Sequence, residues 1–231
     1  MLRALINLFR SDDPLAVIGN DFTRMMRVTF EMTVTAGGIF FTGQASPETR
    51  KSLYQIDIEV NRLERSVRKR LVAHLSIPDN RHDVPHCLAM MSLVKDVERL
   101  GDYAKNLAEI IDLRSGPLPD DEIVRTLSDI RAGVESSFEE ALEVFAQFDR
   151  ERAIALIQQG RDITRRCETL LARIARSTYD TSTTTALVLG TRYYKRIAAH
   201  VLNVLSAVVM PLHKLDYYDE DAITIGEDTG T

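Results

Sequence analysis

The run Val94–Glu109, with the sequence VKDVERLGDYAKNLAE, constrains the fold of this chain more than any other segment. Its apolar residues recur at steps of three and four and are Val94, Val97, Leu100, Tyr103 and Leu107. That spacing places them on one face of an amphipathic α-helix. Similar patterns fill the rest of the chain, and Gly and Pro account for only 11 and 7 of its 231 residues. The sequence therefore predicts an all-α fold.

The interruptions of these patterns predict six long helices. The predicted ranges are 15–42, 46–75, a third helix that carries 94–109 and ends before residue 114, 120–148, 151–177 and 182–215. Ser46 is a suitable N-cap for the second helix, and Pro47 suits its first position. The clearest boundary is RSGPLP at residues 114–119, since Gly and two Pro within six residues are typical of a connection between domains.

This boundary divides the chain into two similar halves, which we interpret as an internal repeat. We expect a three-helix unit at 14–116 and a second one at 117–215. Before them lies a short amphipathic extension, residues 1–13, which we interpret as a docked helix or a partner-binding element rather than a membrane-surface anchor. After them lies an acidic segment, residues 216–231, with no basic residue, which we interpret as a flexible tail.

Acidic side chains lie at helical spacing on two of the predicted helices. On the third helix Glu98 and Asp102 are four residues apart, and on the second helix Asp57, Asn61 and Glu64 share one face. Carboxylates four apart repel each other, so we expect a cation nearby, either an arginine or a metal ion. If the two helices are antiparallel neighbours, these side chains form an oxygen-rich seam of the kind that binds metal ions in helical bundles. Ordinary solvated helix faces are the alternative.

The same residues carry a resemblance to a known family. The pattern Asp57-x-x-x-Asn61-x-x-Glu64 is followed about thirty residues later by ERLGDYAKN, residues 98–106. Together they resemble the PhoU family of phosphate-transport accessory proteins, whose repeat has an acidic helix and then E-R-[IL]-G-D-[YH]-A-x-N. The resemblance implies two tandem three-helix bundles, a metal ion bound by the acidic motif, and a role in regulating phosphate uptake.

We therefore expect a regulatory protein rather than an enzyme. The expected metal ligands are Asp57, Asn61, Glu64, Glu98 and Asp102, and the expected ion is divalent or trivalent, with iron or zinc favoured. The partners that the resemblance implies are a phosphate transporter, a membrane sensor kinase or a sodium–phosphate carrier, with membrane association only through them. A homodimer stays open. An alternative function is a carboxylate–metal enzyme of the helical-bundle type, a hydrolase or oxidase, and a weaker one is phosphotransfer through His200.

The second repeat departs from the motif. Aligning the sixth helix with the third places Lys195 at Glu98 and Ala199 at Asp102. Aligning the fifth helix with the second places Asp162 at Asp57, Arg166 at Asn61 and Thr169 at Glu64. We expect metal binding to be lost there, with Arg166 and Lys195 occupying the place of the cation and pairing with Asp162, and with Asn203 as a further partner.

Composition narrows the remaining possibilities. The net charge of −5 without a basic domain argues against nucleic-acid binding. The two cysteines, Cys87 and Cys167, are far apart and lack a C-x-x-C motif, which favours buried thiols in a reducing cytoplasm. His82, Asp83, His86 and Cys87 are close in sequence and could bind a transition metal. Because Pro85 disturbs helical spacing there, we favour a polar loop instead.

Overall fold

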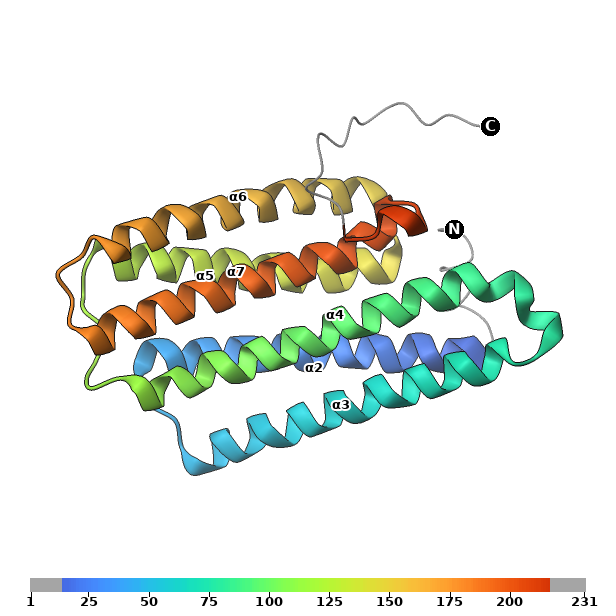
Figure 1. The fold of residues 1–231 in the computed structure, drawn as a ribbon, viewed down its shortest axis with the longest axis horizontal. Helices are drawn as coiled ribbons and strands as arrows, with labels where there is room; N and C mark the ends of the chain where they lie inside the picture. The colour runs from blue at the N-terminus through green and yellow to red at the C-terminus, as the bar shows by residue number, and fades with distance from the viewer. Residues whose placement is uncertain (1–13, 217–231) are drawn as a thin grey trace.

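The structure, a computed structural model, describes residues 14–216. Within that range the chain forms six long helices and no strand, so the predicted all-α fold is confirmed (Figure 1). They are α2 (Pro14–Thr42), α3 (Pro47–Leu75), α4 (Val84–Glu109), α5 (Glu122–Gln147), α6 (Arg150–Ala175) and α7 (Thr181–Val209). Three short 3-10 helices, η1 (Pro78–Asp83), η2 (Ile110–Leu113) and η3 (Leu212–Lys214), accompany them. The predicted N-terminal extension and nearly all of the predicted acidic tail lie outside the described residues.

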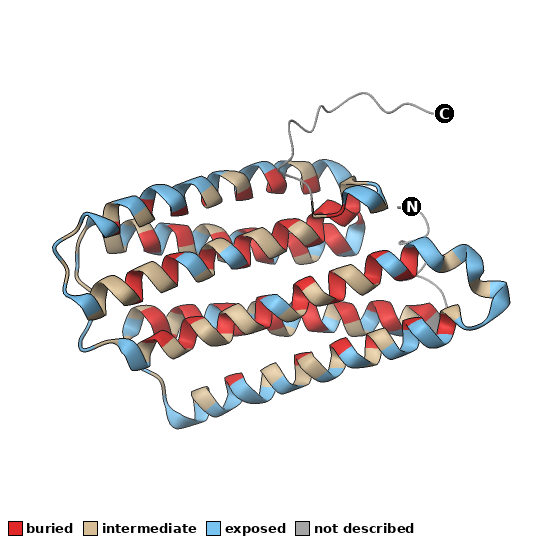
Figure 2. Cartoon of the chain, in the orientation of Figure 1, coloured by how far each residue is buried: buried red, intermediate tan, exposed pale blue. Residues whose placement is uncertain are grey.

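The helices form two three-helix units that share one hydrophobic core. α4 packs on α2 and α3, α7 packs on α5 and α6, and α4 and α7 lie against each other across the middle of the molecule. α2 also contacts α5, so the two units meet along two helix pairs. α3 and α6 lie on the outside, with their outer faces exposed to solvent (Figure 2). α2, α4 and α7 have neighbours on several sides, and they carry more buried residues than α3, α5 and α6.

Local signals explain where the helices begin and end. The Ser46 side chain accepts a hydrogen bond from the Thr49 amide at 3.1 Å, which confirms the predicted cap of α3. α2 continues through Gly37 and Gly38 and ends before Gly43, whose φ of 66° is the left-handed conformation that terminates helices. The prediction that the last helix extends to residue 215 was wrong. α7 ends at Val209, and Pro211, which cannot donate a backbone hydrogen bond, follows two residues later.

The connection between the units is held in place at both ends. Arg114 donates from Nη1 to the Phe40 carbonyl at 2.5 Å, which ties the connection to the end of α2. The Ser115 amide donates to Ser182 Oγ at 2.9 Å, and Ser182 Oγ donates to the Leu113 carbonyl at 2.9 Å. Both units therefore contact the connection through hydrogen bonds as well as through the shared core. No helix within residues 14–216 has the length and apolar character needed to cross a membrane.

Candidate functional site

The two acidic helices of the first unit are neighbours, and their acidic faces meet. α3 supplies Asp57, Asn61 and Glu64, and α4 supplies Glu98 and Asp102. α3 and α4 pack along their length, and ion pairs connect the two acidic faces through lysines of α4. Asp57, Glu64, Glu98 and Asp102 thus lie along one seam. We call these four residues, together with Asn61 on the same face of α3, the acidic seam.

The first part of the acidic seam is built around an ammonium group. Lys105 Nζ lies 3.0 Å from Asp57 Oδ1 and 3.1 Å from Asp102 Oδ1. Burial lowers the pKa of Lys105, but hydrogen bonds to the two carboxylates outweigh this effect and raise the pKa overall. Because Asp57 is only 14% exposed, its charge is balanced mainly by this one lysine.

In the second part of the acidic seam, one to two helical turns away, a lysine again lies between two carboxylates. Lys95 Nζ lies 2.6 Å from Glu98 Oε2 and 4.0 Å from Glu64 Oε1. Arg68 Nη2 lies 3.1 Å from the same Glu64 oxygen, and yet this buried oxygen accepts no well-aligned hydrogen bond. Glu64 is 7% exposed, so it is the most buried acid of the seam. A buried carboxylate oxygen without a hydrogen bond is energetically unfavourable, and this makes Glu64 the strongest candidate for an additional ligand.

The donor chemistry of the acidic seam suits a hard cation, but its arrangement divides the donors into pairs. Carboxylate and amide oxygens are the ligands that hard and borderline divalent cations accept. Within residues 14–216, however, no group of three or more His, Cys, Asp or Glu side chains converges as a metal site requires. Lys95 and Lys105 each occupy a position between two carboxylates where a cation would otherwise lie. The residues therefore fit a metal ion only in a form in which these lysines have moved away.

Sequence reasoning missed these two lysines, although it predicted a nearby cation. Lys95 precedes Glu98 by three residues, and Lys105 follows Asp102 by three. Side chains three residues apart are neighbours on a helix, so this spacing was the available signal. What the spacing could not show is that each lysine also reaches a carboxylate of α3.

In the second unit, the positions that correspond to buried charged residues of the acidic seam are small or apolar. Buried positions of α3 and α6 correspond at a constant offset, as shown by the pairs Leu53/Leu156, Val60/Ile163, Val67/Leu170 and Leu71/Ile174. With that offset Asp57 corresponds to Gly160 and Glu64 to Cys167. Lys105 of α4 corresponds to Leu202 of α7, which is buried. A Cβ atom at position 160 would overlap the Leu202 side chain, so a close Gly–Leu contact replaces the Asp–Lys pair.

This correspondence corrects two predictions for the second repeat. The alignment of Asp162 with Asp57 was wrong by two residues, because it followed charge rather than burial. The proposed salt bridge among Arg166, Lys195 and Asp162 was also wrong. Asp162 pairs with Arg165 at 3.0 Å, and Lys195 pairs with Glu168 at 2.6 Å. Asp162 and Arg166 face a groove beside α5 instead of α7.

Asn203 and His200 belong to a polar cluster between the two units. His200 Nδ1 lies 2.7 Å from Asp96 Oδ1, and Asn203 Nδ2 donates to the same oxygen at 2.8 Å. The His200 ring stacks on Tyr103 with ring centroids 5.5 Å apart. Asp96 is 6% exposed, and Asp216 adds a second carboxylate nearby. Asp96 and Asp216 were not identified from the sequence. The partners of Asp96 on α7 lie about a hundred residues away, and Asp216 lies beyond the end of α7.

The histidine-containing segment forms a polar corner of the fold. His74 Nε2 and Asp83 Oδ2 are 2.8 Å apart, and Asn80 Nδ2 donates to the His74 carbonyl at 3.0 Å. His86 and Cys87 are buried on α4, and burial raises the pKa of the Cys87 thiol to about 11. The four residues that we considered as a transition-metal set therefore do not share one site.

Residues 22–111 match the family model of the PhoU domain. The "Phosphate-specific transport system accessory protein PhoU homolog" of Pseudomonas aeruginosa is 26% identical over 162 residues, which are 67% of this chain and 66% of that relative. The match thus spans slightly less than two thirds of the relative.

Two solved structures share the fold. PhoU from Pseudomonas aeruginosa superimposes with a TM-score of 0.75 at 21% identity, over 84% of this chain and 95% of that chain. PhoU from Streptococcus pneumoniae gives a TM-score of 0.73 at 16% identity, over 87% of this chain and 94% of that chain. Both superpositions include most of the second unit, so the fold extends beyond the residues that match the family model.

Proposed function

We propose that this chain is a member of the PhoU family and that it regulates phosphate uptake through contacts with a phosphate transporter or with a phosphate-signalling partner. The observation that carries this proposal is the PhoU-domain match over residues 22–111 of the six-helix fold. The curated relative is named as an accessory protein of a transport system, and a regulator acts by binding rather than by turnover. We propose accordingly that the chain is not an enzyme and acts in the cytoplasm.

Deletion of the gene in its host tests the regulatory role. We expect phosphate uptake in phosphate-rich medium to be higher in the deletion strain than in the parent, and a plasmid copy to restore the parent level. Cross-linking of the tagged chain in cells, followed by mass spectrometry, identifies the partner. A transporter subunit, a sensor kinase or a sodium–phosphate carrier is the expected outcome. Equal uptake in both strains at low and high phosphate would contradict the proposal.

We further propose that the acidic seam binds a divalent or trivalent cation, with iron or zinc favoured, when Lys95 and Lys105 move away. Asp57, Asn61, Glu64, Glu98 and Asp102 would hold the ion. When bound, the ion would supply positive charge that crosslinks α3 and α4. The two lysines are long, flexible and 41% and 23% exposed, so their ammonium groups can leave the seam without disturbing the core. Metal binding is thus a competition between the ion and two ammonium groups.

Elemental analysis of the purified, untagged protein tests this competition. We expect metal in the parent, a loss in E98A/D102A, and no loss in D129A/E139A, which changes exposed acids of α5. K95M/K105M should take up more metal than the parent at the same free metal concentration, because the competing charges are gone. If the parent and K95M/K105M both remain free of metal after incubation with iron and zinc, the acidic seam is held together by lysines alone.

A further inference from the structure

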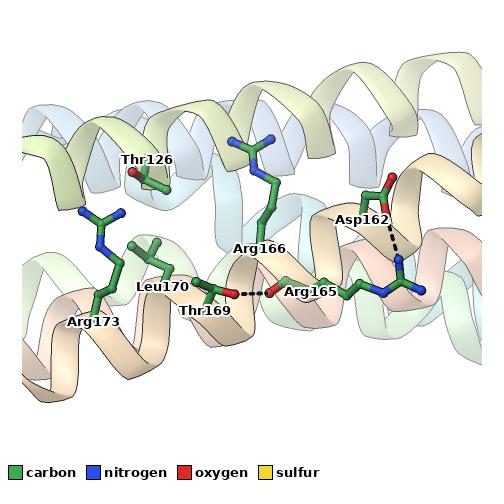
Figure 3. Close-up of a pocket in the computed structure, with 7 residues that line it drawn as sticks. All are labelled: Thr126, Asp162, Arg165, Arg166, Thr169, Leu170 and Arg173. Atoms are coloured by element: carbon green, nitrogen blue, oxygen red, sulfur yellow. Dashed lines mark hydrogen bonds and ion pairs between the residues drawn. The ribbon is translucent and has the colours of Figure 1, made fainter.

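A groove of about 360 Å³ lies on the outer side of the second unit, between α5 and α6. Three arginines line it along α6, Arg165, Arg166 and Arg173, and its remaining lining residues are Thr126, Asp162, Thr169 and Leu170 (Figure 3). In Figure 3 the side chains of Arg166 and Arg173 both extend toward α5, on either side of Thr126. The groove is distinct from the acidic seam, which belongs to the first unit.

The arginines of this groove are available to a ligand. Among residues 14–216 the Arg166 guanidinium has neither an ion pair nor a hydrogen bond with another residue. Arg165 pairs with Asp162, but both side chains are more than 70% exposed. Arg173 pairs with Glu122, which is 81% exposed. Exposed ion pairs contribute little free energy, so an incoming anion can recruit both of these guanidinium groups.

The geometry favours an anion with two charged centres. Arg166 and Arg173 are seven residues apart, which corresponds to about 10 Å along the helix axis. With backbone positions this far apart, two linked phosphoryl groups can contact both guanidinium groups with less bending of the arginine side chains than one phosphoryl group requires. Guanidinium groups bind phosphoryl oxygens through paired N–H donors, and arginine is therefore better suited to this task than lysine.

The other polar groups of the groove set limits on the ligand. Thr126 and Thr169 donate their hydroxyl hydrogens to backbone carbonyls one turn earlier, at 2.7 and 3.2 Å, so the guanidinium groups are the principal donors. Asp162 in the groove and Glu122, which pairs with Arg173 from α5, are acidic and repel a ligand that spreads beyond the arginines. Leu170, which is buried, forms the apolar part of the lining.

From these observations we propose that the groove between α5 and α6 binds the diphosphate group of a small anion. Arg166 provides the unpaired charge, and Arg173 contacts the second phosphoryl group. The ligand is either inorganic pyrophosphate or a nucleoside diphosphate, since both present the same group. This inference goes beyond the proposed regulatory function and does not depend on the acidic seam.

Isothermal titration calorimetry with the full chain tests this proposal. Pyrophosphate, ADP, orthophosphate and sulfate are titrated at equal ionic strength with EDTA present, so that neither metal binding nor screening differs among them. We expect pyrophosphate or ADP to bind at least tenfold more tightly than orthophosphate and sulfate. The tighter of the two diphosphates identifies the source of the group.

Three variants locate the binding. R166Q and R173Q should each weaken diphosphate binding roughly tenfold, as expected for the loss of one charge-assisted contact. R62Q, which removes an exposed and unpaired arginine of α3, should leave it unchanged. The proposal is overturned if no diphosphate binds, if orthophosphate binds equally well, or if R62Q weakens binding as much as R166Q. Because all three positions are on the surface, circular dichroism spectra of the variants should match the parent.

Discussion

The seam between α3 and α4 and the seam between α6 and α7 are built on the same scaffold with opposite chemistry. In the first unit, Asp57 and Lys105 form an ion pair across the helices at 3.0 Å. At the corresponding positions of the second unit, Gly160 and Leu202 are in close apolar contact. The buried apolar positions on either side correspond one to one in both units. The fold thus depends on the apolar stripes, and the residues beside the stripes can differ in chemistry between the two units.

The place where the two units meet shows the same difference on a smaller scale. Tyr103 of α4 and His200 of α7 are corresponding residues, and their rings stack against each other. The neighbours of these rings differ, because His200 bonds Asp96, whereas Tyr103 contacts the ring of Tyr193, which corresponds to Asp96. The polar contact of His200 with Asp96 and the aromatic contact of Tyr103 with Tyr193 therefore occupy corresponding positions in the two units.

The largest effect is expected from placing the charge of the first seam into the second. Gly160→Asp puts a carboxylate against Leu202 without a cation, and should lower the free energy of unfolding by at least about 3 kcal/mol. Urea denaturation followed by circular dichroism measures this loss.

Two further variants separate charge from size at this position. Gly160→Ala should cost less than Gly160→Asp, since it adds only a methyl group to a tight contact. The double variant G160D/L202K rebuilds the pair of the first unit and should recover at least about 1 kcal/mol relative to Gly160→Asp alone. Equal stability of G160D and G160D/L202K would show that the two seams are not equivalent.

A smaller loss of stability is expected when the seam between α3 and α4 is made like the seam between α6 and α7. Lys105→Met leaves Asp57 and Asp102 without their shared ammonium group, and should destabilise the protein by about 1–3 kcal/mol because the pair is only partly exposed. Lys51→Met, at an exposed position of α3, is the control and should have almost no effect. Thermal unfolding in the presence of EDTA measures both. A stability of Lys105→Met equal to that of the parent would mean that the ammonium group contributes nothing.

The polar cluster between the units should make stability depend on pH. Burial, with the nearby Asp96 charge as a smaller cause, raises the pKa of Asp216 to about 6. In the unfolded chain the pKa of Asp216 has its ordinary, lower value. Between the unfolded and the folded pKa the folded state therefore binds more protons than the unfolded state, and the free energy of unfolding falls as pH rises toward 6. Asp216→Asn should therefore raise the unfolding temperature at pH 7 and have no effect below about pH 4. Asparagine also tolerates the left-handed backbone at this position, where φ is 71°.

Thermal unfolding curves from pH 4 to pH 8 measure this difference between Asp216→Asn and the parent. Asp129→Asn, at an exposed position of α5, is the control and should show no pH-dependent gain. A constant difference across the whole range would contradict a role for ionisation of Asp216.

The smallest effect is expected at the surface of α6. Asp162 and Arg165 form an ion pair at 3.0 Å, but their side chains are 71% and 75% exposed. Arg165→Gln should change the free energy of unfolding by less than about 0.5 kcal/mol. Chemical denaturation at low and high salt measures this change in the free energy of unfolding. A loss as large as that of Lys105→Met would show that exposure does not distinguish the ion pairs of the two units.

Much of the fold could be predicted from the sequence, because its evidence is local. Apolar residues at steps of three and four, the cap at Ser46 and the short Gly- and Pro-containing connections predicted six helices close to their observed bounds. The end of the last helix was wrong because the apolar pattern continues past Pro211, which cannot take part in the helical hydrogen bonds. Four of the five predicted residues, Asp57, Glu64, Glu98 and Asp102, form ion pairs with lysines between α3 and α4, and the binding of a metal stays a prediction.

The charges were harder to assign than the helices. In the second unit, aligning similar charges placed Asp162 opposite Asp57, whereas the buried positions show that Gly160 lies there. Gly160 and Leu202 carry no charge that could be aligned with Asp57 and Lys105, so an alignment that followed charge was misplaced. In the first unit, the lysines were visible at the right spacing, but their contacts with α3 were not.

By itself, the sequence determined the helices, their buried faces and the repeat, since all of these follow from the period of the α-helix and from the cost of exposing apolar surface. Only the tertiary structure decided which charged groups meet. Asp57 with Lys105, Asp96 with His200 and the arginines of the outer groove come together because helices distant in sequence pack at particular rotations and offsets. Electrostatic energies change steeply over a few ångströms and with burial, whereas helical periodicity does not depend on such detail.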